Sequence, residues 1–170
     1  MKRETVMSNE NEYIPYIRKY LGHEKIMAVG LCCLIVNEKN EILLEQRSDN
    51  NLYCLPGGAL NFNETVIEGL KREVKEETSI DLDEVKLLMI LSGEKEEFLY
   101  PNGDLTSYVD LIFISFVDSK KIKLNEKHDD ESLSVQFYSQ DKLPSSDNLL
   151  RGTERILNKF LKNNLEIEID

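Results

Sequence analysis

The chain has 170 residues, of which 41% are hydrophobic and 31% charged, and its formal net charge is -11. This composition is typical of a globular protein with a substantial core, and the length favours one domain with at most a terminal extension. The negative charge argues against broad contact with a nucleic acid polymer or an anionic membrane, because such contact needs a basic face. A small phosphorylated ligand stays compatible with it, since a bound metal ion can supply positive charge.

The cysteines indicate a reducing compartment. Cys32, Cys33 and Cys54 are odd in number, and two of them are adjacent in an apolar run. This fits buried, reduced thiols better than a disulfide framework or a zinc site. No apolar run is long enough to span a membrane, and the start of the chain lacks the apolar core of a signal peptide. We therefore expect a cytoplasmic protein.

The first half of the chain predicts an extension followed by strands. We expect residues 1–24 to form an N-terminal extension and residues 25–165 the main domain. Apolar residues at helical spacing predict a helix over 12–21 that ends at Gly22 and packs on the domain or on a second subunit. Residues 26–36 and 41–47 predict two strands joined as a hairpin.

The second half adds strands and a last helix. Residues 85–92, 107–117 and 133–138 have the apolar patterns of strands, and residues 100–104 are typical of a turn. Apolar spacing over 146–163 predicts a helix, with Asp147 as its cap. Together these elements predict an α/β fold, in which a mixed β-sheet is sandwiched between α-helices.

The stretch 57–80 carries the clearest chemical signal. It opens with Gly57 and Gly58 after a proline, and the pair Thr65 and Glu68 has the spacing of a capping box, which predicts a helix start. At about 100° per residue, four apolar residues share the buried face of this helix. They are Val66, Ile67, Leu70 and Val74.

Three carboxylates, those of Glu73, Glu76 and Glu77, follow along the edge of that face. Carboxylates so close together repel one another, and a cation among them relieves the repulsion. Gly69 lies within the same arc, where glycine costs roughly 1 kcal/mol relative to alanine. We expect the Gly57–Gly58 loop to approach there and to add a carbonyl oxygen to a site for Mg²⁺ or Mn²⁺. The alternative is a solvated charged helix held by ordinary salt bridges.

These residues resemble the Nudix box, G-x5-E-x7-R-E-U-x-E-E-x-G-U, in which U is a bulky aliphatic residue. The matching residues are Gly58, Glu64, Arg72, Glu73, Val74, Glu76, Glu77 and Ile80. Ser79 stands where the family has glycine, at a helix end that favours a left-handed residue. We expect Ser79 to cost roughly 1 kcal/mol of stability and to leave metal binding intact. The likeness in layout extends over most of residues 26–161.

The resemblance implies a Nudix fold and a role for each box residue. Glu73 and Glu77 would be the main metal ligands, assisted by Glu76 and by the carbonyl of Gly57 or Gly58. Arg72 and Glu64 would form a supporting ion pair. The catalytic group would comprise Arg72, Glu76 and Glu77, with an acid from a later loop.

Two further positions carry open alternatives. Glu131, flanked by Asp129 and Asp130, is the candidate for the later acid, and a charged surface loop is the alternative. Arg47 ends a strand that leads towards the box, where it would contact a substrate phosphate or simply lie on the surface.

The activity implied is Mg²⁺-dependent hydrolysis of the pyrophosphate linkage of a nucleoside diphosphate derivative. ADP-ribose-like compounds and modified nucleoside triphosphates are favoured as substrates, and dinucleoside polyphosphates and mRNA caps stay open. A non-catalytic nucleotide-sensing or interaction module is the alternative, although the chain keeps all four glutamates. The family also implies a homodimer.

Overall fold

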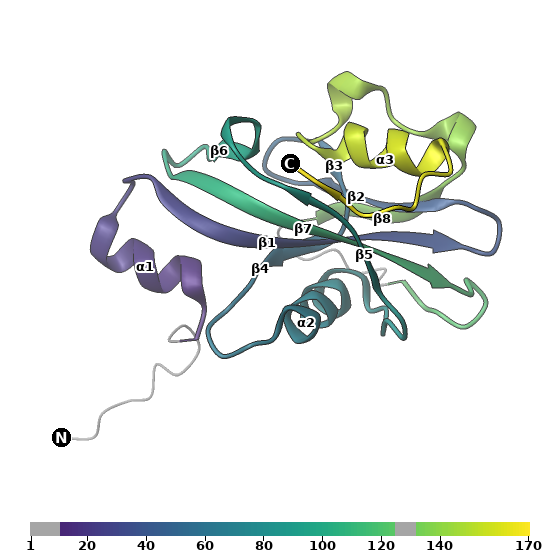
Figure 1. The fold of residues 1–170 in the computed structure, drawn as a ribbon, viewed down its shortest axis with the longest axis horizontal. Coiled ribbons are helices and arrows are strands. Elements are labelled where there is room, and N and C mark those ends of the chain that lie inside the picture. Colours follow the sequence, from purple (N-terminus) through teal and green to yellow (C-terminus); the bar gives the residue numbers. More distant parts are fainter. Residues whose placement is uncertain (1–10, 125–131) are drawn as a thin grey trace.

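The computed structural model describes residues 11–124 and 132–170. Three α-helices lie within them, α1 (Tyr13–Leu21), α2 (Val66–Thr78) and α3 (Thr153–Leu161) (Figure 1). The strands of one mixed sheet are β1 (Ile26–Asn37), β2 (Ile42–Arg47), β3 (Tyr53–Cys54), β4 (Gly57–Ala59), β5 (Lys86–Leu91), β6 (Glu97–Leu99), β7 (Leu105–Val117), β8 (Ser132–Tyr138) and β9 (Glu168–Ile169). The α/β fold with a mixed sheet between helices is confirmed.

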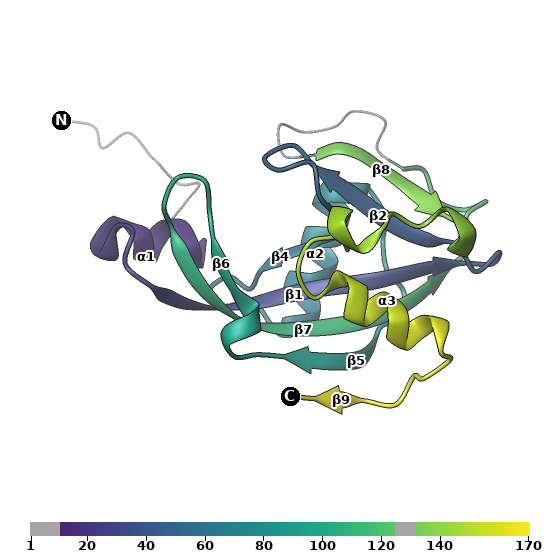
Figure 2. The same cartoon turned by 90° about the horizontal axis from the view of Figure 1, so that it is seen from above.

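The centre of the sheet is the parallel pair of β1 and β7, which stay in register from Ile26 and Thr106 to Asn37 and Val117. Around them the strands follow the order β3-β2-β1-β7-β5-β9, while β4 pairs with β1, β6 with β7 and β8 with β2 (Figure 2). The continuous apolar run of β1 suits a strand that is covered on both faces.

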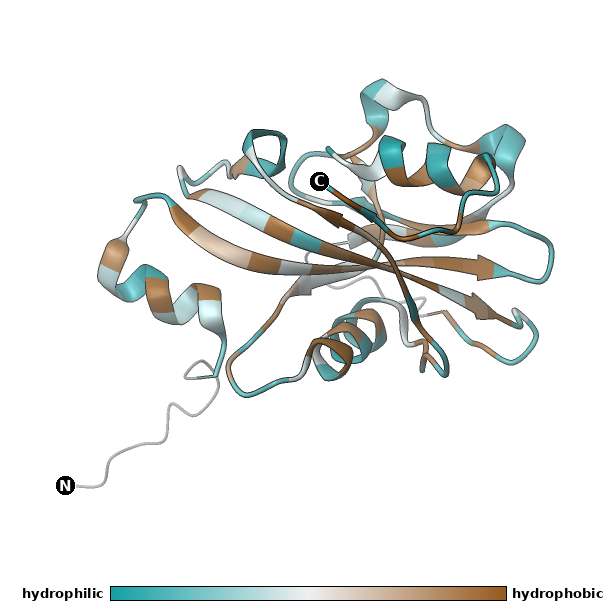
Figure 3. Cartoon of the chain, in the orientation of Figure 1, coloured by the Kyte–Doolittle hydropathy of each residue, from teal (hydrophilic) through white to brown (hydrophobic). Residues whose placement is uncertain are grey.

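The two faces of the sheet bury separate apolar layers. On one face, Leu31, Cys33 and Ile35 of β1 pack against Leu70 and Val74 of α2. On the other face, apolar residues of β1, β5 and β7 pack against α3; they include Leu34, Val36, Leu88, Ile112, Ile156 and Phe160. Figures 1 and 3 show α2 and α3 on opposite sides of the largely hydrophobic strands. Alternate residues of β1 therefore serve opposite layers, as a period of two requires.

Helix α1 packs on the body of the same chain, which answers the question that the sequence left open. The rings of Tyr13 and Tyr16 each stand edge-on to Phe62 at 5.5 Å between centroids. Tyr13 also donates its backbone N–H to Asn61 Oδ1 at 3.0 Å. At the other end, Arg18 donates to the carbonyl of Leu105 at 2.9 Å. The helix thus joins the loop before α2 to the start of β7.

Helix α2 begins and ends as its sequence predicts. Glu68 N–H donates to Thr65 Oγ1 at 3.3 Å, and the Glu68 carboxylate accepts from Thr65 N–H at 2.9 Å, which completes the capping box. Ser79 follows the helix with φ of 63°, in the left-handed region. Its N–H donates to Lys75 O at 2.9 Å, so the helix end is satisfied although a side chain stands where glycine is preferred.

One sequence expectation holds in shortened form, and another was wrong. The first two strands form the expected antiparallel hairpin, but β1 and β2 pair only at Val36 and Ile42, and β2 runs mainly along β8. The last helix begins at Thr153, so Asp147 is not its cap. Leu150 N–H donates to Tyr53 O at 2.8 Å, and Gly152 has φ of 75°. The residues before Thr153 therefore contact β3 and form a turn, so they are not helical.

Strand β9 was not expected. This strand lies after residue 165, where the predicted domain ended, and it pairs in parallel with β5. Arg155 of α3 forms ion pairs with Glu168 and Asp170 at this end of the chain. Among the described residues, no helix is both long enough and apolar enough to cross a membrane.

Candidate active site

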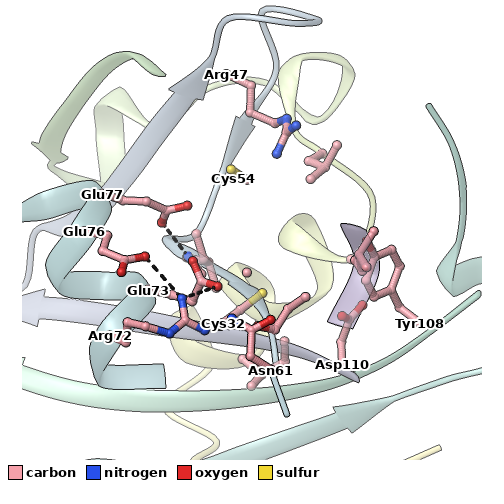
Figure 4. Close-up of a pocket in the computed structure, with 18 of the residues that line it drawn as sticks. Cys32, Arg47, Cys54, Asn61, Arg72, Glu73, Glu76, Glu77, Tyr108 and Asp110 are labelled. Atoms are coloured by element: carbon pink, nitrogen blue, oxygen red, sulfur yellow. Dashed lines mark hydrogen bonds and ion pairs between the residues drawn. The ribbon is translucent and has the colours of Figure 1, made fainter. Parts of the chain in front are cut away.

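A cavity of about 1130 Å³ opens beside the box helix. Residues of α2, β4, β1 and β7 line it, together with the segment that leads into α3. Figure 4 shows Glu73, Glu76 and Glu77 on one side of this cavity and Tyr108 and Asp110 on the other. The cavity therefore has two chemically different ends, one at the box helix and one at Tyr108 and Asp110.

Gly57 and Gly58 are glycines because other groups lie where their side chains would be. A Cβ on Gly57 would stand 1.9 Å from the carbonyl oxygen of Leu31 on the adjacent strand β1. A Cβ on Gly58 would stand 2.5 Å from the carboxyl carbon of Glu73. The two glycines thus allow the β4 backbone to lie directly against β1 and against a carboxylate of the box helix.

The three helix carboxylates are buried in the order that their angular positions predict. The Glu73 side chain is 16% exposed and that of Glu76 is 60% exposed. Glu77 turns towards β4, where its Oε2 accepts the Gly57 N–H at 2.7 Å. Burial raises the pKa of Glu73, although Arg72 opposes this. Burial, followed by the charge of Glu45, raises the pKa of Glu77 well above the ordinary carboxyl range.

Arg72 holds this end of the cavity together. Its Nε and Nη2 donate to the two carboxylate oxygens of Glu64 at 2.5 Å and 3.0 Å, in the forked geometry that guanidinium and carboxylate favour. Its Nη1 lies 2.8 Å from Glu73 and 3.2 Å from Glu76. The box arginine therefore contacts three of the four box glutamates, and it lowers the pKa of Glu64.

Two details of the helix differ from the sequence expectation. A Cβ on Gly69 would meet Leu31, Leu60 and Glu64, so this glycine makes room for them rather than for the Gly57–Gly58 loop. Ile67 was placed on the buried face, but it is 40% exposed. It lies in the first turn of α2, at the margin of the apolar stripe.

Glu45 is a buried carboxylate at the site that the sequence analysis did not single out. It lies on β2, is 4% exposed and accepts a hydrogen bond from the Ser132 hydroxyl. Its side chain is also in hydrogen-bond contact with Glu77. The available signal was a charged residue at an inward position of a strand, because Leu43 two residues earlier is buried in the core.

Arg47 lies on the wall of the cavity, but it is already engaged. Asp49 accepts from its Nε at 2.9 Å and from its Nη2 at 2.8 Å. A phosphate would have to share this guanidinium with Asp49. The candidate late acid, Glu131, and its neighbours Asp129 and Asp130 lie outside the described residues.

The far end of the cavity is built around Arg151, which sequence analysis also missed. Arg151 forms ion pairs with Glu96 and, at 3.4 Å, with Asp110. Its guanidinium carbon stands 5.3 Å from the centroid of the Tyr108 ring and 5.7 Å from that of Phe98. Burial raises the pKa of Asp110 to about 6, with Arg151 acting in the opposite direction. The one signal in the sequence was an aspartate within the apolar run of β7.

The donor set at the box end suits a hard divalent cation. Carboxylate and carbonyl oxygens are the ligands that Mg²⁺ and Mn²⁺ prefer, and the buried carboxylates Glu73 and Glu77 carry raised pKa values that a cation would reverse. Within the described ranges, no three acidic, histidine or cysteine side chains are already gathered around one point. Glu73 and Glu77 are instead held by Arg72 and by Gly57 N–H.

Comparison with known proteins agrees with this fold. The family model described as the NUDIX domain matches residues 27–160. Over 131 residues the chain is 29% identical to an ADP-ribose pyrophosphatase of Methanocaldococcus jannaschii, which covers 75% of this chain and 70% of that protein. It is 30% identical over 115 residues to the human 8-oxo-dGDP phosphatase NUDT18, covering 66% of this chain and 32% of that protein.

The fold has solved counterparts as well. The MutT protein of Methanosarcina mazei Go1 aligns with a TM-score of 0.65 and 26% identity, over 84% of this chain and 99% of that one. The architecture and the box define an α/β protein with a carboxylate-rich helix beside a large cavity. The chain belongs to the Nudix hydrolase family. It spans only about a third of the length of the NUDT18 proteins that it matches.

Proposed function

We propose that this protein hydrolyses the pyrophosphate linkage of a nucleoside diphosphate derivative with the help of Mg²⁺ or Mn²⁺. The observation that carries the proposal is the joint packing of Glu73 and Glu77 against the Gly57–Gly58 backbone. This arrangement concentrates oxygen ligands beside a large cavity in a chain of net charge -11, where a polyphosphate needs a cation to bind.

Glu73 and Glu77, with Glu76 and the carbonyl of Gly57 or Gly58, would hold the metal. When bound, the metal would neutralise phosphate oxygens and promote ionisation of the attacking water. Arg72 keeps Glu64 and Glu73 fixed through the contacts described above, so it orients the ligands. Glu76 and Glu77 are the described candidates for accepting a proton from water, and Glu131 stays a further candidate.

The named relatives support the substrate class. ADP-ribose and 8-oxo-dGDP, which appear in the names of two similar proteins, are both nucleoside diphosphate compounds. We therefore propose an ADP-ribose-like compound or a modified nucleoside phosphate as substrate. The homodimer and the cytoplasmic location remain predictions.

The test is a substrate panel with product identification. ADP-ribose, other nucleoside diphosphate sugars and nucleoside di- and triphosphates would be incubated with protein and Mg²⁺, Mn²⁺ or EDTA. We expect metal-dependent release of a nucleoside monophosphate from at least one class. Tight nucleotide binding without hydrolysis of any compound would favour the sensing module instead.

A further inference from the structure

The end of the cavity opposite the box helix has the chemistry of a site that accepts hydrogen bonds from a ligand. Two carboxylates, Glu96 and Asp110, face one guanidinium, Arg151, so the cluster carries one net negative charge when both acids are ionised. Glu96 is 5% exposed and Asp110 has a side chain that is 14% exposed, so these charges are weakly screened by water. A phosphate is disfavoured there, whereas a ligand with N–H donors is favoured.

The position of Asp110 is tightly defined. Asp110 is the register partner of Gly30 across β1 and β7, and a Cβ on Gly30 would stand 1.9 Å from Asp110 Oδ1. This absent side chain gives the carboxylate room to lie over the sheet. Arg151 completes the frame, because its guanidinium covers the Tyr108 ring.

The cluster is not fully satisfied as it stands. The Nε of Arg151 is buried and finds no hydrogen-bond partner among the residues that the structure describes. A buried donor of this kind costs free energy, which a ligand acceptor that reaches the guanidinium would recover after a small shift of the side chain. Apolar side chains of Leu91, Ile112 and Ile156 line the same cavity and give it an apolar wall.

The distance from the box also fits. Gly57 pairs with Cys32, which pairs with Ile112 on its other side, and Asp110 lies two residues along β7. Two strand spacings and two residues of rise place the Gly57 and Asp110 Cα atoms roughly 12 Å apart. A nucleoside whose phosphates lie at the box can therefore reach Asp110 with its base.

We propose that Asp110, framed by Arg151 and Glu96, reads the nucleobase of the substrate and prefers guanine. A carboxylate beside an arginine is an acceptor, and guanine alone among the common bases offers two adjacent N–H donors, N1–H and N2–H₂, next to the O6 acceptor. The other bases offer one donor on an edge, so they make one hydrogen bond fewer. This inference rests on the proposed function only in placing the phosphates at the box.

The test measures binding without hydrolysis, so that it stands apart from the catalytic claim. GMP, AMP, CMP and UMP, which contain no phosphoanhydride bond that could be cut, are titrated into the full chain in Mg²⁺ by calorimetry. We expect GMP to bind tightest, by about 5- to 150-fold over the other bases, the range that one bidentate base contact gives. Equal affinities, or tightest binding of another base, would overturn the proposal even if the enzyme hydrolyses nucleotides.

Two further measurements distinguish recognition of the base from a general loss of structure or binding. Asp110→Asn is expected to remove the preference for GMP, while Glu94→Gln, which neutralises an exposed carboxylate two residues from Glu96, is expected to keep it. IMP lacks the 2-amino group, so the unaltered protein should bind it about tenfold more weakly than GMP. IMP binding as tight as GMP, or an equal loss for every base in Asp110→Asn, would refute the assignment. The IMP comparison needs no variant and so does not depend on folding of the mutant.

Discussion

Replacing Glu77 by Gln should change stability in opposite directions with and without metal. Glu77 is in contact with the buried Glu45, and both burial and that neighbour raise its pKa. An acid whose pKa is raised by folding loses native stability as the pH rises, because the native state then binds more protons than the unfolded state. Glutamine removes this cost, and its side-chain oxygen can still accept the Gly57 N–H, a bond of 2.7 Å. We therefore expect metal-free Glu77→Gln to melt higher than the metal-free wild type at pH 8.

With metal bound, we expect the wild type to melt higher than Glu77→Gln. At a metal concentration of 100 times Kd, binding stabilises the native state by about 2.7 kcal/mol, which corresponds to a rise of about 5–11 °C in Tm for a chain of this size. A tenfold loss of affinity in the variant removes about 1.4 kcal/mol, or about 3–6 °C of that rise. Thermal melts with EDTA and with a Mn²⁺ series would measure both effects.

The matched control is Glu76→Gln, because Glu76 is 60% exposed and its charge is well screened. This variant should melt close to the wild type without metal. If metal-free Glu77→Gln melted lower than the wild type and gained the full shift with Mn²⁺, the reasoning about this carboxylate would be refuted.

Three further predictions concern other contacts. Arg72→Ala should lower the free energy of unfolding by about 1–3 kcal/mol in urea, since it leaves the half-buried Glu64 without its ionic partner. Arg72→Lys should restore little of this, because lysine lacks the forked donor geometry, and full rescue by lysine would argue against the bidentate role. Ser79→Gly should raise stability by about 1 kcal/mol at the left-handed position and leave the metal-induced shift in Tm unchanged, whereas destabilisation would contradict the account. Asp110→Asn should gain stability relative to the wild type as the pH rises from 4 to 6, because the raised pKa of about 6 makes the native state bind the extra proton in that window. The difference should approach about 3 kcal/mol above pH 6 by the relation between pKa and free energy, and a flat difference across pH would contradict it.

The sequence predicted the box helix well because its signals are local. The capping box at Thr65 and Glu68 and the order of carboxylate burial follow from local sequence and helical geometry, while the left-handed end at Ser79 was implied by the resemblance to the Nudix box. The apolar strands were also predicted from the sequence, because β1 and β7 are covered on both faces and therefore consist of long apolar runs.

The misses depend on contacts between distant segments. Apolar spacing before Thr153 looked helical, yet Leu150 hydrogen-bonds to Tyr53 nearly a hundred residues earlier. Glu45 and Asp110 are single charged residues in apolar strands, and only the packing of α2 and of the segment before α3 onto the sheet brings Glu45 to Glu77 and Asp110 to Arg151. Sequence periodicity carries no information about such partners, so the far end of the cavity could not be predicted.

Turnover of the best substrate by Glu77→Gln tests the central claim most directly. If the box carboxylates position a metal at the phosphoanhydride, kcat/KM in saturating Mg²⁺ should fall by at least about a hundredfold, since removal of one such group typically costs that much. Circular dichroism would establish that the variant is folded. A folded Glu77→Gln protein with unchanged turnover would contradict the account.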